Sequence, residues 1–364
     1  MGNTTSGVSV SFNNRSAIIQ SVSPTEIKVI IPLTATGKVT LTINGQVTEG
    51  PVFTYGSQLN TPYTGGNIQL SSQADVDAFA AQNKVANLQI TGSLSISGSG
   101  ITSLAGLSNI TSVVGMLTVS GTQISDPRFL NNVTSVGGLI LQGLPINAVV
   151  MDKLTVSTGS VRVSGCPNLR SASYKSLSSI TGTEYLGSLF IGACEHLADL
   201  DLKQLSSTTY RITVSNTLLT DLNAFSALKN AGALTISGNP NMLSLRGLEN
   251  LTQLTMPAMG RGISSFAPTI NGLIITQNSK LSSPNGIRNL SVVPIASITY
   301  NTSLTDLCPA KSWLNYLATL PDYSSKRQNL SGFIVTTPLP ALTLTANGSY
   351  TTQADALAAL ALCR

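Results

Sequence analysis

An aliphatic-x-aliphatic step recurs through the middle of the chain, with a different residue between its two apolar positions each time. Successive steps begin about 19 to 28 residues apart, and most intervals are 22 or 23 residues. A repeat of this length is typical of one coil of a leucine-rich or β-helical solenoid. The steps are Leu94-Ile96, Leu117-Val119, Leu139-Leu141, Val161-Val163, Leu189-Ile191, Ile212-Val214, Leu234-Ile236, Leu254-Met256, Leu273-Ile275 and Ala296-Ile298.

More aliphatic residues follow each step at intervals of three, as in Met242, Leu245, Leu248 and Leu251. This spacing would also suit an amphipathic helix. However, Ser, Thr, Asn and Gly are frequent between these positions, and they are poor helix formers. We therefore expect short strands joined by tight corners, stacked around one aliphatic column.

One corner position holds either Asn or Cys, three residues before a Leu or Met. An amide can satisfy backbone groups that a sharp turn leaves unpaired, and a thiol can do so weakly while remaining apolar enough for burial. We interpret these residues as a structural corner ladder, and we expect its two cysteines to be buried thiols rather than a bridge or a metal pair. The ladder is Cys166, Cys194, Asn216, Asn239, Asn278 and Asn301.

The stretches GALTISGNPNMLSLRGLENLTQL and GSLSISGSGITSLAGLSNITSVVG resemble the receptor L-domain family and its bacterial leucine-rich surface relatives. The resemblance covers roughly residues 66 to 307. It implies a right-handed β-helix or leucine-rich solenoid whose inward corner accepts Asn or Cys. For function, it implies a domain that binds proteins or glycans, or a rigid spacer.

The first part of the chain, to about residue 55, alternates apolar and polar residues with a period of two. Asn13-Asn14 and Asn44-Gly45 provide turns, so we predict an antiparallel β-sandwich. The stretch SPTEIKVIIPLTATGKVTLTINGQ, with the closing PVFTYG, resembles the IPT/TIG immunoglobulin-like family over residues 7 to 56. That family's opening strand would lie before Met1, so the resemblance implies a truncated sandwich whose unpaired edge is available for self-association.

Capping helices are expected at both ends of the solenoid, because a solenoid exposes its apolar column there. SSQADVDAF at residues 71–79 and TTQADAL at 351–357 each place a hydroxyl three residues before an Asp, as in a capping box. We predict helices at 73–82 and 353–362. A third helix is expected after Cys308-Pro309, with Trp313, Leu314, Leu317 and Leu320 facing inward.

These elements predict four segments. Residues 1–57 form the partial sandwich, 58–66 a linker, 67–307 the solenoid with its first cap helix, and 308–364 the C-terminal cap. Cys308 and Cys363 both fall in that last segment, which favours a disulfide between them if the protein is exported.

Composition limits the range of functions. Charged residues make up only 10% of the chain, so hydroxyls and amides must cover much of its surface. The net charge of +5 is scattered, which argues against a nucleic-acid partner. No apolar stretch reaches about 18 residues, the length of a transmembrane helix. We expect a location outside the cell, on a bacterial surface, reached through a signal or lipid anchor upstream of Met1.

The sequence offers little for catalysis. Its one His, His196, follows Cys194-Glu195, but the corner pattern points Cys194 inward and His196 outward. Asp199 and Asp201 could form the carboxylate pair of a glycosidase, yet alternation places both on one solvated face. We expect no catalytic, cofactor or metal site, and a β-helical carbohydrate-active enzyme is the weaker alternative.

The residues between the anchors should form an outward row: Ser95, Thr118, Ile140, Arg162, Phe190, Thr213, Thr235, Thr255, Ile274 and Ser297. Thr ladders stabilise neighbouring strands, and this structural interpretation covers most of the row. Ile140, Arg162 and Phe190 are consecutive, and such side chains are typical of contact patches. We predict a non-catalytic adhesion or binding protein whose ligand, a protein or a glycan, contacts these three residues. The alternative within this class is the glycan-binding component of a polysaccharide uptake system.

Overall fold

The protein is described by a computed structural model that covers residues 7–30, 37–53, 61–63, 65–182, 187–255, 272–318, 342–345 and 352–363. The chain is mainly β and divides into two compact units, Met1–Asn60 and Thr61–Arg364. None of the described helices has the length and apolar character needed to cross a membrane.

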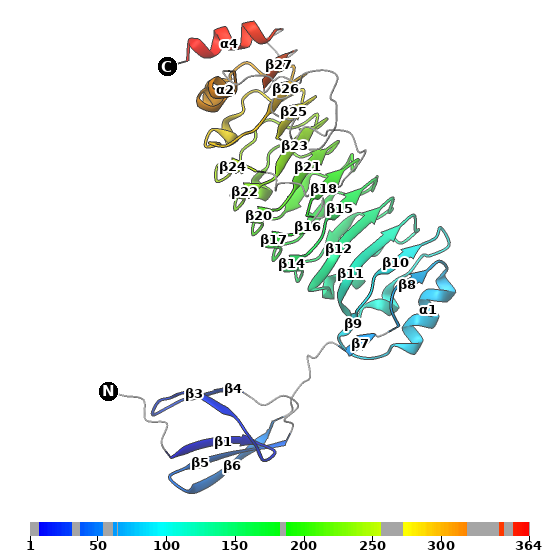
Figure 1. The fold of residues 1–364 in the computed structure, drawn as a ribbon. Coiled ribbons are helices and arrows are strands. Elements are labelled where there is room, and N and C mark those ends of the chain that lie inside the picture. Colours follow the sequence, from blue (N-terminus) through cyan, green and yellow to red (C-terminus); the bar gives the residue numbers. More distant parts are fainter. Residues whose placement is uncertain are drawn as a thin grey trace, which may run out of the picture. The chain divides into compact units, whose positions relative to one another are not determined.

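The first unit consists of small antiparallel sheets (Figure 1). Asn13 and Asn14, like Asn44 and Gly45, have positive φ angles and form two-residue turns between paired strands. Val10 and Phe12 are its buried apolar residues among those described, so this unit has a small core. One sheet has the order β2 (Arg15–Ser16), β1 (Val8–Phe12), β5 (Gly37–Ile43) and β6 (Gln46–Phe53), and the other pairs β3 (Ile18–Val22) with β4 (Ile27–Ile30).

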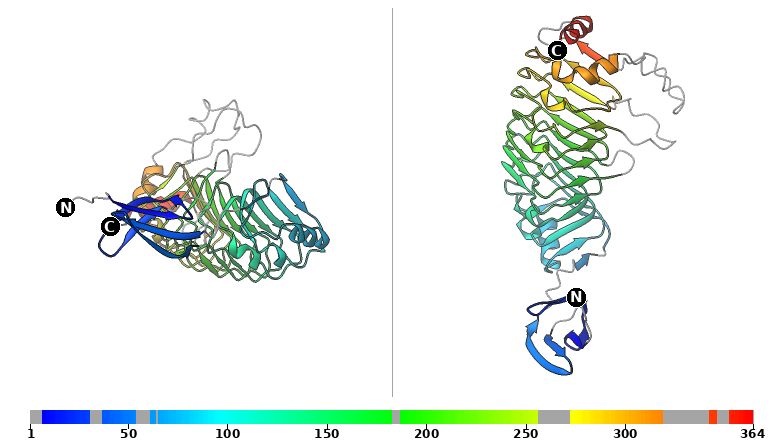
Figure 2. Two further views of the ribbon diagram at one scale, coloured as in Figure 1. Left: turned by 90° about the horizontal axis from the view of Figure 1, so that it is seen from below. Right: turned by 90° about the vertical axis from the view of Figure 1, so that its left-hand side faces the viewer.

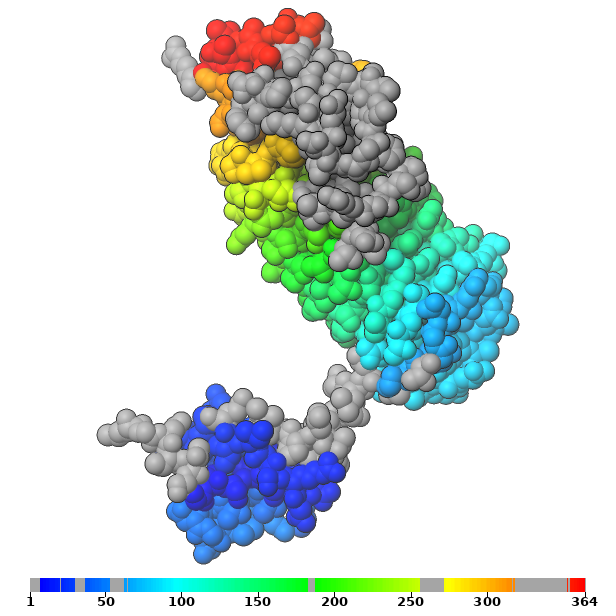
Figure 3. All heavy atoms as spheres, in the orientation of Figure 1, coloured from blue at the N-terminus to red at the C-terminus, as the bar shows by residue number. Residues whose placement is uncertain are grey.

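The second unit is a solenoid built on an 18-stranded parallel sheet (Figure 1). Its longest strands come from successive coils and pair in register, so that equivalent residues lie side by side. Figures 2 and 3 show these coils following one another in chain order along the stack. The series contains β8 (Ile68–Leu70), β10 (Leu94–Ser97), β11 (Ile110–Ser120), β12 (Ser135–Gln142), β15 (Val161–Ser164), β18 (Leu189–Gly192), β21 (Arg211–Ser215), β23 (Ala233–Ser237), β25 (Leu273–Thr276), β26 (Ala296–Thr299) and β27 (Leu342–Thr345).

Shorter strands line a second side of each coil, and 3-10 turns connect several of them. The second side contains β7 (Thr61–Tyr63), β9 (Leu88–Ile90), the first residues of β11 and β12, β14 (Val156–Ser157), β17 (Ser179–Ile180), β20 (Ser207–Thr208), β22 (Asn230–Ala231) and β24 (Gln253–Leu254). A third side is formed by β13 (Ala148–Val150), β16 (Ser171–Ser173) and β19 (Asp199–Asp201). The 3-10 turns are η1 (Ala105–Leu107), η2 (Arg128–Asn132), η3 (Asn223–Phe225), η4 (Asn285–Ile287) and η5 (Cys308–Ala310). Within the range predicted as a linker, Thr61–Tyr63 pairs with β9 of the solenoid.

One predicted anchor is wrong. Leu254 lies in β24, which pairs with β22 on the second side, and Leu234 of β23 pairs directly with Leu273 of β25. The coil between these two anchors is therefore long, and the other half of the supposed anchor, Met256, lies outside the described residues. Thr255 consequently has no place in the outward row, because Thr235 is paired with Ile274.

A tight corner follows each long strand from β11 to β26, and it accounts for one further correction. The residue that follows the strand has a positive φ in the left-handed region: Gly121, Gly143, Gly165, Ala193, Asn216, Gly238, Gln277 and Tyr300. The next residue then points inward. Asn216 was expected at that inward position, but it has a φ of 51° and is exposed, while Thr217 is buried in its place. Spacing from Leu219 points to Asn216 because this coil has one residue fewer than its neighbours between the inward corner residue, Thr217, and the next buried Leu.

The inward corner residues form a hydrogen-bonded ladder along part of the stack. Asn239 Nδ2 donates to Asn278 Oδ1 at 3.1 Å, and Asn278 Nδ2 donates to Asn301 Oδ1 at 3.1 Å. Each Oδ1 also accepts a backbone N–H from the preceding coil, as in the 3.1 Å contact from Thr217 to Asn239. All three amides are fully buried, so their pairing is essential to the stability of these coils.

A second ladder lies at the exposed corner before the shorter strands. Asn132 Nδ2 donates to the Ser108 carbonyl at 2.9 Å, and the Thr134 hydroxyl donates to the Thr111 carbonyl at 2.9 Å. The same Asn-x-Ser/Thr arrangement recurs at Asn289 and Ser291, which bond the carbonyls of Glu249 and Thr252. These motifs therefore connect each coil to the one before it.

Helices cover the two ends of the aliphatic column. α1 (Gln73–Gln82) and α4 (Gln353–Ala361) both begin with a capping box, formed by Ser72 with Asp75 and by Thr352 with Asp355. α2 (Lys311–Ala318) follows η5 and buries Trp313, Leu314 and Leu317, whereas Leu320 lies outside the described residues.

Candidate binding face

The outward row of the long strands runs through paired positions of successive coils. Its members are Ser95, Thr118, Ile140, Arg162, Phe190, Thr213, Thr235, Ile274 and Ser297. Most are hydroxyl residues, as expected for a face that packs side chain against side chain between strands. The neighbouring strands β12, β15 and β18 (Figure 1) depart from this rule, since there the row changes to Ile140, Arg162 and Phe190. Ile274 of β25 is a single further departure.

Arg162 and Phe190 are in direct contact. The guanidinium carbon of Arg162 lies 4.1 Å from the centroid of the Phe190 ring, which is a cation–π geometry. Arg162 Nε also donates to the Ser164 hydroxyl at 3.2 Å, so two contacts hold this exposed side chain in place. The guanidinium is thereby preorganised on the surface of the sheet.

Gly192 has no side chain, and this leaves space for the ring of Phe190. A Cβ atom at this position would lie only 2.9 Å from Phe190 Cε1 and 3.0 Å from Cζ. The equivalent positions of the neighbouring coils are Ser164 and Ser215. The Phe190 ring therefore extends across the backbone of Gly192 and remains half-buried on the sheet.

Arg211 belongs to the same face and was missed in the sequence. It begins β21, whose residues Arg211, Thr213 and Ser215 alternate outward with the buried Ile212 and Val214. Its side chain is half-buried, and burial lowers the pKa of its guanidinium. The alternation before the Ile212 anchor is the signal that could have identified it.

Comparison with known proteins does not assign the chain to a family. No family model matches the sequence, and no curated protein is similar enough to count as a match.

The two corner cysteines lie inside the column, away from this face. Cys166 and Cys194 are both buried free thiols whose sulfurs approach backbone carbonyls of Ser164 at 3.6 Å and Gly192 at 3.4 Å. A hydrogen bond with Cys194, together with burial, raises the pKa of Cys166. Neither thiol is placed to react with a ligand on the outward row.

The acidic and histidine residues considered for chemistry are spread over the surface. His196 is exposed while its neighbour Cys194 is buried, so the structure does not bring the two side chains into one site. Asp199 and Asp201 lie on one face of β19, beside Ser171 and Ser173 of β16. Within the described ranges, no group of three or more His, Cys, Asp or Glu is arranged to hold a metal ion.

Asp152, which lies two residues after β13, is held by several polar contacts. It accepts the Ser173 hydroxyl and lies 3.2 Å from Lys175 Nζ. Burial raises its pKa, but the hydrogen bonds from Ser173 and Lys175 outweigh that effect and the pKa lies below its ordinary value. A carboxylate held in this way stays ionised and stabilises the coil rather than exchanging protons near neutral pH.

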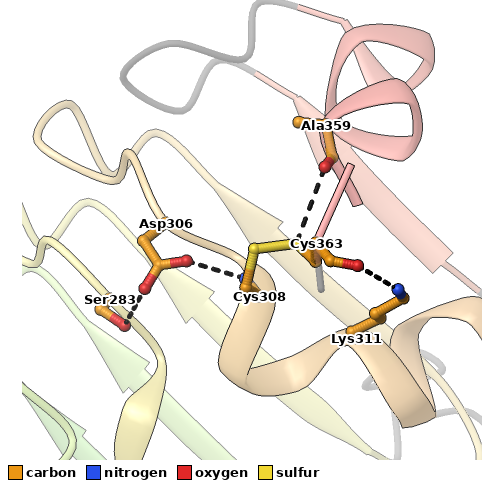
Figure 4. The surroundings of a disulfide bond; sticks show 6 residues. All are labelled: Ser283, Asp306, Cys308, Lys311, Ala359 and Cys363. Carbon is orange, nitrogen blue, oxygen red and sulfur yellow. Dashed lines mark hydrogen bonds between the residues drawn. A yellow bond between two sulfur atoms is a disulfide. The ribbon is translucent and has the colours of Figure 1, made fainter. Parts of the chain in front are cut away.

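In the C-terminal cap, a disulfide joins Cys308 to Cys363 across 55 residues of chain (Figure 4). Asp306 Oδ1 accepts the Cys308 backbone N–H at 2.9 Å, and Lys311 Nζ donates to the Cys363 carbonyl. The bond ties the end of α4 to the start of α2. It lies at the end of the stack and contributes to the cap, not to the outward row.

Proposed function

We propose that this protein is a non-catalytic binding or adhesion protein that acts outside the cell, where the outward row contacts a protein or glycan partner. The observation that carries the proposal is the Arg162–Phe190 pair, in which a guanidinium and an aromatic ring replace the hydroxyls of the row. Arginine and aromatic side chains dominate the energetics of binding surfaces. The solenoid fold does not require them at these positions.

The extracellular location is part of this proposal. The Cys308–Cys363 disulfide supports it, because disulfides persist in oxidising compartments. Two family assignments are proposals that rest on sequence resemblance: the second unit as a right-handed leucine-rich solenoid of the receptor L-domain type, and the first unit as an immunoglobulin-like module. Display on a bacterial surface is proposed on the same basis.

A glycan partner is the more specific form of the proposal. Thr213 and Thr235 follow Phe190 in the row, and Thr118 precedes Ile140. Their hydroxyls both donate and accept hydrogen bonds and so match the hydroxyls of sugars. This observation favours the glycan-capture alternative over adhesion to a protein.

A binding screen tests the proposal. The full chain is immobilised and tested against arrays of glycans and of cell-surface proteins, in parallel with the double variant Arg162→Ala/Phe190→Ala. We expect at least one partner to bind the natural chain and to be lost with the double variant. Ser95→Ala, in the same row but several coils away, should leave binding unchanged. Equal binding by the natural chain and the double variant would contradict the proposal.

A further inference from the structure

The two cysteines of the inward corner occupy neighbouring coils. Cys166 lies two residues after the end of β15, and Cys194 lies two residues after the end of β18. These strands pair in register, with Ser164 opposite Gly192, and the backbone N–H of Gly165 donates to the Gly192 carbonyl at 3.2 Å. The cysteines are therefore stacked on one another, although they lie 28 positions apart in the sequence.

This stacking meets the distance requirement of a disulfide. Neighbouring strands lie about 4.8 Å apart, and disulfides join cysteines whose Cα atoms are about 4.4 to 6.8 Å apart. Both side chains point into the same apolar column, where they are fully buried. They also share a hydrogen bond, which raises the pKa of Cys166. The two sulfur atoms are thus neighbours in the reduced state that the structure shows.

Elsewhere in the inward corner, polar side chains link one coil to the next. Asn239, Asn278 and Asn301 are joined by hydrogen bonds between their amides, and Asn239 also accepts the Thr217 hydroxyl at 2.8 Å. Between the two cysteines the link is weaker, because a thiol is a poor hydrogen-bond donor. A disulfide would replace this contact with a covalent bond, and it would place no charge in the column.

We propose that Cys166 and Cys194 form a second disulfide, which joins the coils of β15 and β18 from the inside. The inference goes beyond the proposed function but rests on its extracellular location, because disulfides persist in oxidising compartments. Cys308 and Cys363 are paired with each other in the structure, so each corner cysteine has the other as its partner.

The bond forms by exchange with a small disulfide such as oxidised glutathione. The thiolate of one cysteine attacks a glutathione sulfur, the S–S bond of glutathione breaks, and one glutathione leaves as a thiolate. The second cysteine then loses its proton, and its thiolate attacks the protein sulfur of this mixed disulfide and releases the other glutathione. Two cysteine thiols are oxidised while one oxidised glutathione is reduced, and the two cysteine protons pass to the departing glutathione thiolates. Because both side chains are buried in the folded chain, exchange takes place while the coils assemble.

The experiment counts free thiols in the full chain after its export to an oxidising compartment. The chain is purified without reductant, unfolded in denaturant and treated with a thiol-specific alkylating reagent, and the labels are counted by mass spectrometry. We expect no label on the natural chain. Cys194→Ser should carry one label, on Cys166, whereas the double variant Cys308→Ser/Cys363→Ser should again carry none.

Digestion with trypsin identifies the pairing, because Arg170 and Lys175 lie between the two corner cysteines. Without reductant, the expected product is a peptide of residues 163–170 linked to a peptide of residues 176–203. Reductant should separate the two peptides, and Cys194→Ser should not yield the linked product.

Burial allows a further test, which distinguishes the two disulfides. Cys308 is exposed, whereas Cys166 and Cys194 are fully buried. A reductant added to the folded chain should therefore open the bond of the cap and yield two labels, on Cys308 and Cys363. Four labels are expected only when reductant and denaturant are combined. Four labels on the folded chain would contradict a disulfide buried in the column.

Three results of the thiol count and the digest would overturn the inference. Two labels, on Cys166 and Cys194, with the cap bond closed would show that the pair stays reduced, and would leave the proposed function intact. Four labels on the natural chain without reductant would refute the inference and would also remove the support for an extracellular location. A linked peptide that joins either corner cysteine to Cys308 or Cys363 would assign the bonds differently.

Discussion

The inward and outward sides of the long strands follow different rules. On the inward side every anchor from Leu94 to Ile298 is aliphatic, and none is more than 1% exposed. On the outward side the row is mostly Ser and Thr but changes to Ile140, Arg162 and Phe190 in three neighbouring coils. Each coil of a solenoid packs on its neighbours in the same way, so the inward residues must be aliphatic in every coil. The outward residues are not restricted in this way, and a change from hydroxyl residues to other types there is therefore the better indicator of function.

The first prediction compares adjacent residues on the two sides of one strand. Ile191 is fully buried in β18, and Ile191→Ala should lower the free energy of unfolding by about 4 kcal/mol, because it removes apolar contacts and leaves a cavity. Phe190→Ala, one residue away and half-buried, should cost about 1 kcal/mol or less. Urea denaturation of both variants measures the difference. Equal losses would mean that the Phe190 ring is part of the core.

The second prediction concerns the buried amide ladder. Asn278→Ala would remove the side chain that accepts the backbone N–H of Asn239 and donates to the carbonyl of Ile236. It should destabilise the protein by about 3 kcal/mol. Asn216→Gly is the control, because Asn216 is exposed and glycine adopts its left-handed conformation readily. Its unfolding midpoint should hardly change. A larger effect at Asn216 than at Asn278 would contradict the assignment of the inward corner.

The third prediction tests the end of the stack. Cys308→Ala/Cys363→Ala should make opening of the C-terminal cap easier by about 2 kcal/mol, since a disulfide that closes a long loop restricts the unfolded chain. Hydrogen exchange should accelerate in α2 and α4 and remain unchanged in β12 and β15. Adding a reductant to the natural chain should reproduce this pattern, and unchanged exchange in α2 and α4 would show that the bond does not hold the cap.

The smallest expected effect is the coupling within the candidate site. A double-mutant cycle with Arg162→Ala and Phe190→Ala should give an interaction energy of about 0.5 to 1 kcal/mol in the free protein, as for an exposed cation–π pair. The energy is obtained from the unfolding free energies of the single and double variants. A coupling of several kcal/mol would indicate that the contact between Arg162 and Phe190 mainly stabilises the fold, and would weaken the assignment of the pair to binding.

Much of the solenoid can be predicted from the sequence because aliphatic residues recur at the interval of one coil. Leu117, Leu139, Val161 and Leu189 lie in register as their spacing predicts. Leu254 was misplaced because the second side of each coil also contains buried aliphatic residues. When one coil is longer than the rest, spacing alone cannot tell the two sides apart.

The candidate site was predictable in part. Register places Ile140, Arg162 and Phe190 side by side once the anchors are aligned. The stacking of Arg162 on Phe190 and the space above Gly192 depend on side-chain conformations, which periodicity does not describe. Arg211 lies before its anchor, where the strand extends one residue further than the repeat requires.

The most direct test of the account is to map where a bound ligand lies. Hydroxyl-radical footprinting of the full chain, with and without a partner found in the binding screen, reports the solvent access of individual aromatic side chains. Tyr300 is an internal reference, because it is 59% exposed and lies at a corner several coils from Phe190. We predict that the partner reduces modification of Phe190 and leaves Tyr300 unaffected. Equal modification of Phe190 with and without the partner, under conditions in which it binds, would contradict the account.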